Sequence, residues 1–347
     1  MSIQTVSGII TREKLGVVMP HEHVFIDLSS FFSPKHIPGC SDTSMDCVTI
    51  DKIGILSRDP YALRDNLLMT DFETQCAEIA CLRDAGGLTI VDMTSIGLAR
   101  DPHSLLEASR RTGLNIVAGT GFYVGTTHSK VTGSASIQML CDLMCRELMQ
   151  GMDDTDIRAG VIGEIGVSEF FSELEHKVLM AAAMAHEKTG QAISVHINPW
   201  TTHGVEAAKL LLKANVPPEK ICICHVDVEN RRPYIQELLD LGVFIEFDNF
   251  GKEYFVQRSA RRFGYGTFVT DIQRVVLLRE LVDKGYEHQI LLSCDVCLKT
   301  LLHAYGGWGY DHLLRNILPM AIEEGISQKQ LDVMIVDNPG RFLDTND

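Results

Sequence analysis

Two histidines near the N-terminus have a spacing that suits metal binding. In the stretch MPHEHVFIDL, His21 and His23 flank Glu22 at the end of the apolar run GVVM. In a β-strand, residues i and i+2 point to the same face, so the two imidazoles would lie side by side while Glu22 turns away. Two neutral imidazoles on one face form half of a metal site. A pair of surface or hydrogen-bonded histidines has the same local pattern, so the rest of the chain must supply further ligands.

Four more side chains with metal-binding chemistry follow short β-branched runs. They are Glu164 in AGVIGEIGVS, His196 in QAISVHIN, His225 in KICICHVD and Asp295 in QILLSCDV. Each one alone has a simpler explanation, namely a core histidine, a salt-bridge partner or a helix N-cap. Their shared position at the end of a run points instead to a common structural cause.

Eight such runs alternate with helix-like segments along the chain. The runs cover residues 16–23, 86–97, 114–123, 159–168, 191–198, 220–227, 242–251 and 289–296. Between them, apolar residues recur at three- and four-residue spacing, as in 71–86, 172–190 and 234–242. Strands alternating with helices predict a parallel sheet, and eight units predict an α/β fold of the (β/α)₈ TIM-barrel type. An open doubly wound sheet is the alternative, but no G-x-G-x-x-G motif follows the first strand.

The length of the chain is compatible with a single domain. It has 347 residues, and α/β barrels often run well past the size of other domains. We therefore expect one barrel domain over residues 1–347. Residues 29–70 fit no strand–helix unit and are predicted to form a long loop insertion after the first strand, which would either wall the active site or merely cover the barrel.

The barrel fold predicts that all six candidate residues meet. Catalytic side chains of (β/α)₈ barrels lie at the C-terminal ends of the strands. Four imidazoles and two carboxylates packed together at that end would repel one another and lose hydration unless a cation held them. The sequence thus predicts a metal site at the mouth of the barrel.

Charge and composition exclude several classes of protein. The formal net charge is −15, from 46 acidic and 31 basic side chains, and no basic stripe that would bind a nucleic acid or an anionic membrane is present. No apolar stretch has the length of a membrane span and the N-terminus lacks a signal-peptide core, so we expect a cytoplasmic protein. Most of the ten cysteines lie inside apolar patterns, which predicts packed thiols rather than disulfides. The expected partner is a small-molecule substrate.

Several motifs together resemble the phosphotriesterase-homology family, in the phosphotriesterase-like branch of the amidohydrolase superfamily. The markers extend over nearly the whole chain: HEH, GTGFYV, AGVIGEIGVS, SVHIN, CHVD, IEFDNFG, LLSCDV, YGGWGYDHLLRNILP and DNPGRFL. The best-known phosphotriesterases bridge two metals with a carboxylated lysine of the fourth strand. This chain has Glu164 there, as the phosphotriesterase-related proteins do, which argues against phosphotriester hydrolysis as its natural activity.

The resemblance implies that six residues form a binuclear metal centre. The more buried metal would be held by His21, His23 and Asp295, the more exposed one by His196 and His225, and both by the bridging Glu164. Nitrogen and oxygen ligands suit Zn²⁺, with Mn²⁺, Fe²⁺ or Co²⁺ as alternatives. A water bridging two such ions ionises near neutral pH, and Asp295 would accept its proton and pass it to the leaving group.

Five further residues are candidates for substrate recognition. Tyr123 ends the third strand, where its hydroxyl could bond the polarised oxygen of the substrate or its ring could pack at the barrel rim. Lys299, after the eighth strand, suggests an anionic substrate group, although a surface salt bridge is an equal alternative. Lys252 and Arg258, after the seventh strand, suggest the same group. Asn198 either faces the site or caps a turn.

Two functions of different class remain. The first is a binuclear metal-dependent hydrolase that cleaves a small carboxylic ester, lactone or N-acyl amide bearing an anionic group, with phosphotriester or phosphodiester cleavage as a neighbouring option. The second is non-catalytic ligand binding on the same scaffold. The presence of every metal ligand favours the hydrolase, because a retired site has no need of them. A homodimer is a further expectation from the resemblance.

Overall fold

Eight parallel strands form a nearly closed barrel in the computed structural model, which describes residues 2–34, 41–256 and 266–345. The strand order is β14-β11-β10-β9-β8-β7-β6-β3. The strands are β3 (Val17–Glu22), β6 (Gly87–Asp92), β7 (Asn115–Thr120), β8 (Val161–Val167), β9 (Ile193–Ile197), β10 (Ile221–Ile223), β11 (Phe244–Phe247) and β14 (Ile290–Leu292). Each one lies within a predicted run, so the (β/α)₈ fold is confirmed.

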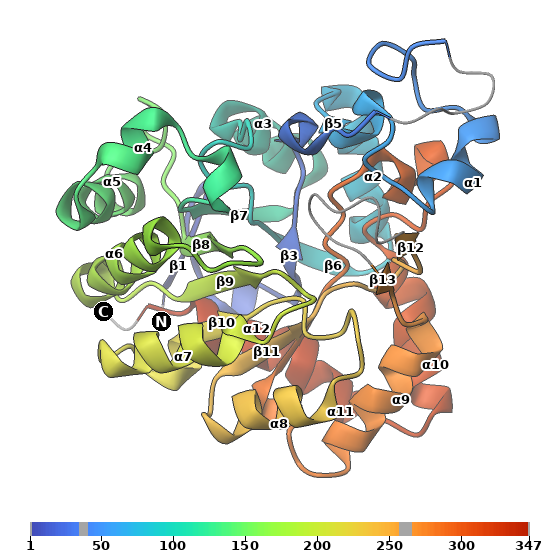
Figure 1. Cartoon of the computed structure of the whole chain (residues 1–347). Coiled ribbons are helices and arrows are strands. Elements are labelled where there is room, and N and C mark those ends of the chain that lie inside the picture. Colours follow the sequence, from blue (N-terminus) through green and yellow to red (C-terminus); the bar gives the residue numbers. More distant parts are fainter. Residues whose placement is uncertain (1, 35–40, 257–265, 346–347) are drawn as a thin grey trace.

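Helices surround the strands on the outside of the barrel (Figure 1). The longer ones are α2 (Phe72–Asp84), α3 (Pro102–Thr112), α5 (Ile137–Met149), α6 (Glu173–Thr189), α7 (His203–Lys213), α8 (Arg232–Asp240) and α9 (Asp271–Val282). Shorter helices follow as α4 (Lys130–Ser134), α10 (Leu318–Glu323), α11 (Gln328–Asp332) and α12 (Asn338–Leu343). Local sequence explains their ends: α6, for example, begins at a capping box of Ser172 and Glu175 and ends at Gly190 in a left-handed conformation. The three helices predicted from periodicity are confirmed.

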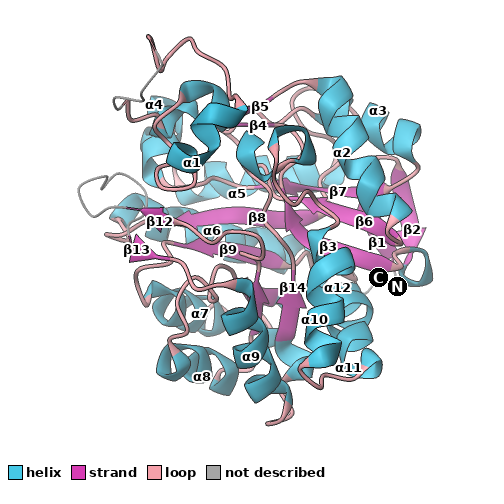
Figure 2. Ribbon diagram, turned by 90° about the vertical axis from the view of Figure 1, so that its right-hand side faces the viewer, coloured by secondary structure: helices cyan, strands magenta, loops and turns pink. Residues whose placement is uncertain are grey.

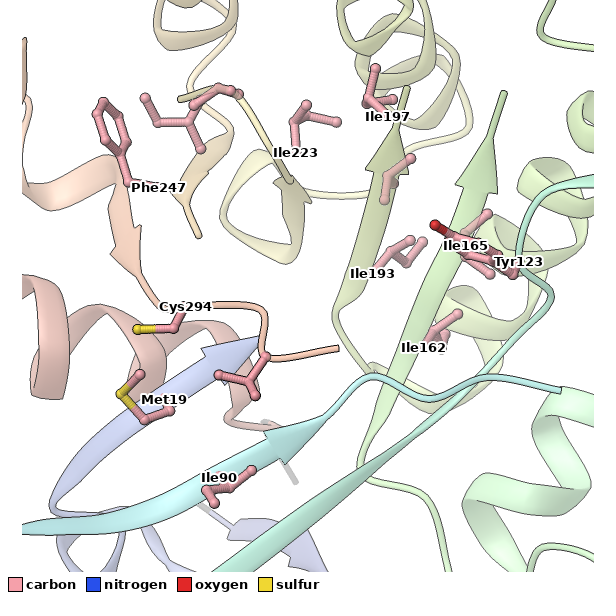
Figure 3. Close-up of a cluster of buried hydrophobic side chains, with 14 of the residues drawn as sticks. Met19, Ile90, Tyr123, Ile162, Ile165, Ile193, Ile197, Ile223, Phe247 and Cys294 are labelled. Atoms are coloured by element: carbon pink, nitrogen blue, oxygen red, sulfur yellow. The ribbon is translucent and has the colours of Figure 1, made fainter. Parts of the chain in front are cut away.

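Alternate residues of each strand face the inside of the barrel. Ala192, directly before β9, belongs to a buried cluster that includes residues of the other seven strands, whereas Ile193 and Val195 of β9 belong to the larger cluster shared with the helices, part of which is drawn in Figure 3. Because side chains alternate along a strand, Ser194 and His196 follow Ala192 into the interior. The inner face of β9 therefore changes from apolar to polar toward its C-terminal end, where the predicted site lies.

The opposite end of the barrel is closed by the N-terminal hairpin. Strands β1 (Ser2–Thr5) and β2 (Gly8–Thr11) pair antiparallel, and Ile3 is fully buried in the inner cluster. Figure 2 shows this hairpin and both termini at one end of the strands, with β12 (Phe255–Val256) and β13 (Gly266–Thr267) at the other. The hairpin thus covers the end of the barrel opposite to the predicted site.

The predicted insertion after the first strand has structure of its own. It contains α1 (Ile53–Leu56) and β5 (Leu68–Met69), and β5 pairs with β4 (Ile26–Asp27) at the start of the insertion. A small separate core stabilises it, formed by Val48, Leu56, Ala62 and Leu63. The described part of the insertion therefore has its own hydrophobic core and secondary structure, and is not an unstructured loop.

The thiols of the described residues are free, as the sequence predicted. Cys222 and Cys224 pack in the inner cluster of the barrel, and Cys141 and Cys145 are buried on α5. In the same parts of the chain, no helix has both the length and the apolar character needed to cross a membrane.

Candidate metal centre and active site

The structure brings all six predicted metal ligands together at the C-terminal end of the barrel. They are His21 on β3, His23 directly after it, Glu164 on β8, His196 on β9, His225 after β10 and Asp295 after β14. All six are at most 8% exposed. Segments separated by more than 270 residues in the chain thus contribute to one buried polar cluster.

One half of the cluster is formed by residues of the first and last strands. His23 Nε2 lies 3.2 Å from Asp295 Oδ1, and His21 Nε2 lies 3.9 Å from the same oxygen. The ligand atoms of these three residues all lie within 4.8 Å of one another, close enough to share one cation.

The other half is centred on the Glu164 carboxylate. Its Oε1 lies 2.9 Å from His196 Nδ1 and 3.1 Å from His225 Nε2. The same Oε1 is 3.6 Å from His21 Nε2, and Oε2 is 4.0 Å from His23 Nε2. Glu164 therefore reaches the imidazoles of both halves, which is the position that a bridging carboxylate requires.

Two of the six residues reach the cluster through a left-handed backbone. His225 has φ 61° and Asp295 has φ 47°. Strand alternation would place His225 on the face opposite Cys222 and Cys224, which already point into the barrel. The left-handed conformation interrupts that alternation and turns the imidazole of His225 inward as well.

Oxygen atoms behind the cluster hold three of the imidazole rings. Each contact joins Nδ1 of a histidine to a side-chain oxygen: His21 to Glu246 (3.2 Å), His225 to Asp248 (3.0 Å) and His23 to Thr94 (3.0 Å). With Nδ1 engaged in this way, Nε2 of each ring is left for a metal. The sequence analysis missed Glu246 and Asp248 in this role, although their i, i+2 spacing in IEFDNFG is the same signal that marked HEH.

The cluster has the electrostatic character of a cation site. His21 Nε2 is buried and has no hydrogen-bond partner among the described residues. Burial disfavours the protonated ring, but the charges of Glu164, Glu246 and Asp295 outweigh burial and raise the pKa of His21 to about 10. A nitrogen without a partner, surrounded by buried carboxylates, fits a divalent cation as the missing positive charge.

A cavity opens directly above the cluster and includes two of the predicted substrate contacts. Tyr123 lines it, with its hydroxyl 3.3 Å from His196 Nδ1. Lys252 also lines it, and its ammonium is ion-paired with Asp295 Oδ2. The wall is otherwise largely aromatic and aliphatic, and includes Trp200, Tyr254, Phe268, Leu98 and Leu298.

Two of the other predicted contacts, Lys299 and Asn198, are not among the residues that line the cavity. The Nζ of Lys299 lies 2.5 Å from Asp65 Oδ1, so the salt-bridge alternative describes it. Asn198 accepts the backbone N–H of Trp200 at 3.1 Å, which is the turn cap named as its alternative. Arg258 lies outside the described residues.

The insertion after the first strand forms part of the cavity wall. Pro60 and Tyr61 line the cavity directly. Arg58 stacks over the ring of Phe255 on β12 at 4.9 Å, which joins the insertion to the segment that follows β11. Residues 29–70 were predicted either to wall the active site or to cover the barrel, and their described part contributes to the wall of the cavity above the six-residue cluster.

Comparison with known proteins places this site in a family. A model of the phosphotriesterase family matches residues 1–343. The chain belongs to the phosphotriesterase family. Over 98% of its length it is 35% identical to the N-acetyltaurine hydrolase of Danio rerio and 31% identical to that of Homo sapiens, covering 97% of each relative.

Two solved structures of bacterial proteins are similar to the chain. A resiniferatoxin-binding protein from Rhodobacter sphaeroides superposes with a TM-score of 0.94 at 31% identity, covering 99% of this chain and 95% of that one. The phosphotriesterase homology protein from Escherichia coli, complexed with phosphate in its active site, has a TM-score of 0.78 at 30% identity, covering 95% and 99%. Enzymes of the phosphotriesterase family use a binuclear metal centre. The protein described here, as a member of that family, is a metal-dependent hydrolase.

Proposed function

We propose that this enzyme hydrolyses small N-acyl amides whose amine portion carries a carboxylate or sulfonate. The observation that carries the proposal is Lys252, which is the only lysine or arginine among the described residues that line the cavity. A buried ammonium beside the reacting centre supplies the charge that an anionic substrate needs. The full-length similarity to N-acetyltaurine hydrolases supports the same class of substrate. Esters and lactones with such a group belong to the same reaction type.

Six residues would hold two divalent ions, for which Zn²⁺ is the best match. Glu164 would contact both ions, with His21, His23 and Asp295 on one side and His196 and His225 on the other. When bound, the two ions would polarise the acyl oxygen and lower the pKa of a water molecule between them. The barrel over residues 1–347 would act as one catalytic domain, and its free thiols favour a reducing, cytoplasmic location.

Three residues of the chain would perform the remaining chemistry. Lys252 would hold the anionic group of the substrate with the N–H groups that do not face Asp295. Tyr123 would donate its hydroxyl hydrogen to the acyl oxygen; burial raises the pKa of Tyr123 well above its ordinary value, so the hydroxyl stays protonated. Asp295 would accept the proton of the attacking water and deliver it to the leaving nitrogen, because it lies between the metal ligand His23 and Lys252.

Hydrolysis of a phosphate ester is the second candidate. It is favoured by the Escherichia coli homology protein, which holds phosphate in its active site. A phosphodiester would present its negative charge to the same ammonium of Lys252, whereas a phosphotriester is neutral, so both alternatives differ from the amide in the bond cleaved.

Metal analysis followed by hydrolysis assays tests the proposal. The purified protein is analysed for transition metals and then assayed with N-acetyltaurine, N-acetyl-β-alanine, the neutral N-acetylethanolamine, a lactone, an aryl ester and a phosphotriester. We expect about two equivalents of metal and a preference for the two anionic amides over the neutral one. Equal rates on charged and neutral amides would refute the role of Lys252, and full activity without metal would refute the metal-dependent mechanism.

A further inference from the structure

Glu22, the residue between His21 and His23, contacts the segment that carries Asp295. Its side chain is fully buried. Oε1 accepts hydrogen bonds from the Ser293 hydroxyl at 2.8 Å and from the Cys294 N–H at 2.9 Å. Oε2 accepts the Val296 N–H at 2.7 Å. The three donors come from residues on both sides of Asp295, so one carboxylate holds the whole turn.

This turn joins the first and last strands of the barrel. The carbonyl oxygen of His21 accepts the N–H of Asp295 at 3.1 Å, and it lies 2.8 Å from the Ser293 hydroxyl, whose single hydrogen is shared between this carbonyl and Glu22 Oε1. Glu22 and His21 thus contact four consecutive residues, from Ser293 to Val296, through the end of β3. Within that turn Asp295 adopts φ 47°, a left-handed conformation that is uncommon for non-glycine residues and is held here by the contacts of the turn.

The orientation of the Asp295 carboxylate depends on this conformation. Its Oδ1 points to His23 Nε2 at 3.2 Å, and its Oδ2 points to Lys252. The backbone dihedrals set the direction of the Cα–Cβ bond, so a different φ at Asp295 would alter the contacts with both partners. Proton transfer and metal binding by Asp295 both require that it stay in place, because a displacement of about 1 Å costs on the order of 10²-fold in rate.

We propose that Glu22 is a positioning residue for the reaction, which fixes Asp295 between the metal ligands and Lys252 by holding the Ser293–Val296 turn. The inference rests on the function proposed above, since it concerns the work of Asp295 in that reaction. All three residues of the HEH motif would then have a role in the reaction. The two histidines would bind metal from one face of β3. Glu22, between them, holds the turn that follows β14.

A second buried glutamate offers a matched control. Glu78 on α2 also accepts two backbone N–H groups from the chain after β14, those of His303 at 2.9 Å and Ala304 at 2.8 Å. It also contacts one side-chain donor, the His303 ring, at 3.2 Å. Glu78 holds a segment that contributes nothing to the cavity. Its loss would therefore report the purely structural cost of removing such a carboxylate.

The test compares Glu22→Gln with Glu78→Gln in the metal-loaded enzyme. Glutamine has the shape of glutamate, but its amide nitrogen faces one of the N–H groups and cannot accept a hydrogen bond from it. We expect Glu22→Gln to lower kcat by about 10–100-fold with KM within about twofold, and Glu78→Gln to leave both unchanged. If the two variants lose equal stability and neither changes kcat, Glu22 is a structural residue only and the proposal is overturned.

Two further measurements separate this inference from the proposed function. In a double-mutant cycle, Glu22→Gln should add no further loss of kcat to Asp295→Asn, because Glu22 acts through Asp295; additive losses would refute that route. The visible absorption of the Co²⁺-substituted protein reports the Asp295 ligand without any substrate. A spectrum altered by Glu22→Gln and unaltered by Glu78→Gln supports positioning even if every substrate in the panel fails, and identical spectra contradict it.

Discussion

Lys252 and Asp295 form a buried ion pair on the floor of the cavity, between the ammonium Nζ and carboxylate Oδ2. Burial alone would lower the pKa of a lysine, but the charge of Asp295 outweighs burial and raises the pKa of Lys252. Burial alone would raise the pKa of Asp295, and Lys252 with the nearby imidazoles lowers it instead. Both groups therefore stay charged near neutral pH. The ammonium of Lys252 also has N–H groups that do not face Asp295 and can bind a substrate.

Replacing Lys252 with methionine should abolish the preference for anionic substrates. A charge-assisted hydrogen bond contributes about 1.5–3 kcal/mol, so the ratio of kcat/KM for N-acetyltaurine to that for N-acetylethanolamine should fall by roughly 10–100-fold. The ratio is the informative quantity, because loss of the partner of Asp295 affects both substrates. Steady-state kinetics on the two amides measures it.

Lys299→Met is the control for that experiment. Lys299 is paired with Asp65 and lies outside the cavity wall, so its loss should leave the ratio unchanged. A ratio that falls equally in both variants would mean that the loss of any positive charge from the protein weakens binding of the anionic substrate, and that no specific contact with Lys252 is involved.

Asp295→Asn should preserve the fold and suppress turnover. Asparagine keeps the shape of the side chain, but it loses the carboxylate charge that faces Lys252 and cannot accept and pass on a proton. General acid–base groups contribute about 10²–10⁴-fold, and kcat should fall by that factor. Circular dichroism and single-turnover kinetics check the two parts of the prediction. Asp65→Asn, which also removes the carboxylate partner of a lysine, should retain full activity.

Removal of metal should make the stability of the fold decrease as the pH rises above neutral. In the metal-free protein the pKa of His21 is raised to about 10 and that of His225 well above its usual value, because burial is outweighed by Glu164 for His21 and by Asp248 for His225. A pKa that is higher in the folded state stabilises the fold below the unfolded value, about 6.5, and this stabilisation is lost as the pH rises toward 10. The melting temperature of chelator-treated protein should therefore fall between pH 6.5 and 9.5.

The metal-loaded protein supplies the comparison. Its imidazoles bind as neutral ligands, so they carry no proton to lose over the same range. Loaded samples should keep their melting temperature between these two pH values. Parallel curves for the loaded and metal-free protein would contradict the assignment of His21 and His225 as ligands.

Arg274→Met should be strongly destabilising. This arginine is fully buried on α9, and its guanidinium contacts Asp227 Oδ2 at 3.1 Å, Asp271 Oδ1 at 2.9 Å and the carbonyl oxygen of Lys252 at 2.9 Å. Its removal leaves buried carboxylates without a counter-charge, which costs about 3–5 kcal/mol. Unfolding in denaturant measures the loss. Arg232→Met, which breaks a surface pair with Glu280, should cost less than about 1 kcal/mol.

Much of this protein could be predicted from the order of residue types. The eight runs and their helices depend on hydrophobic periodicity, which is a local property, and the structure confirms them. The metal-ligand candidates were recognisable because a barrel places the ends of all its strands at one rim. Glu246 and Asp248 had the same spacing as HEH, but a single strand does not show which ring each carboxylate meets.

The sequence by itself determined the fold, the six-residue cluster and the hydrolase family, because strand alternation and motif spacing act over a few residues. Tertiary structure decided the rest. It selected Lys252 and not Lys299 for the cavity, since that choice depends on packing between segments far apart in the chain. It also turned His225 and Asp295 inward through left-handed backbone conformations that no local pattern encodes. Contacts across the barrel, namely those of Glu22 with the residues on either side of Asp295, hold the conformation of Asp295.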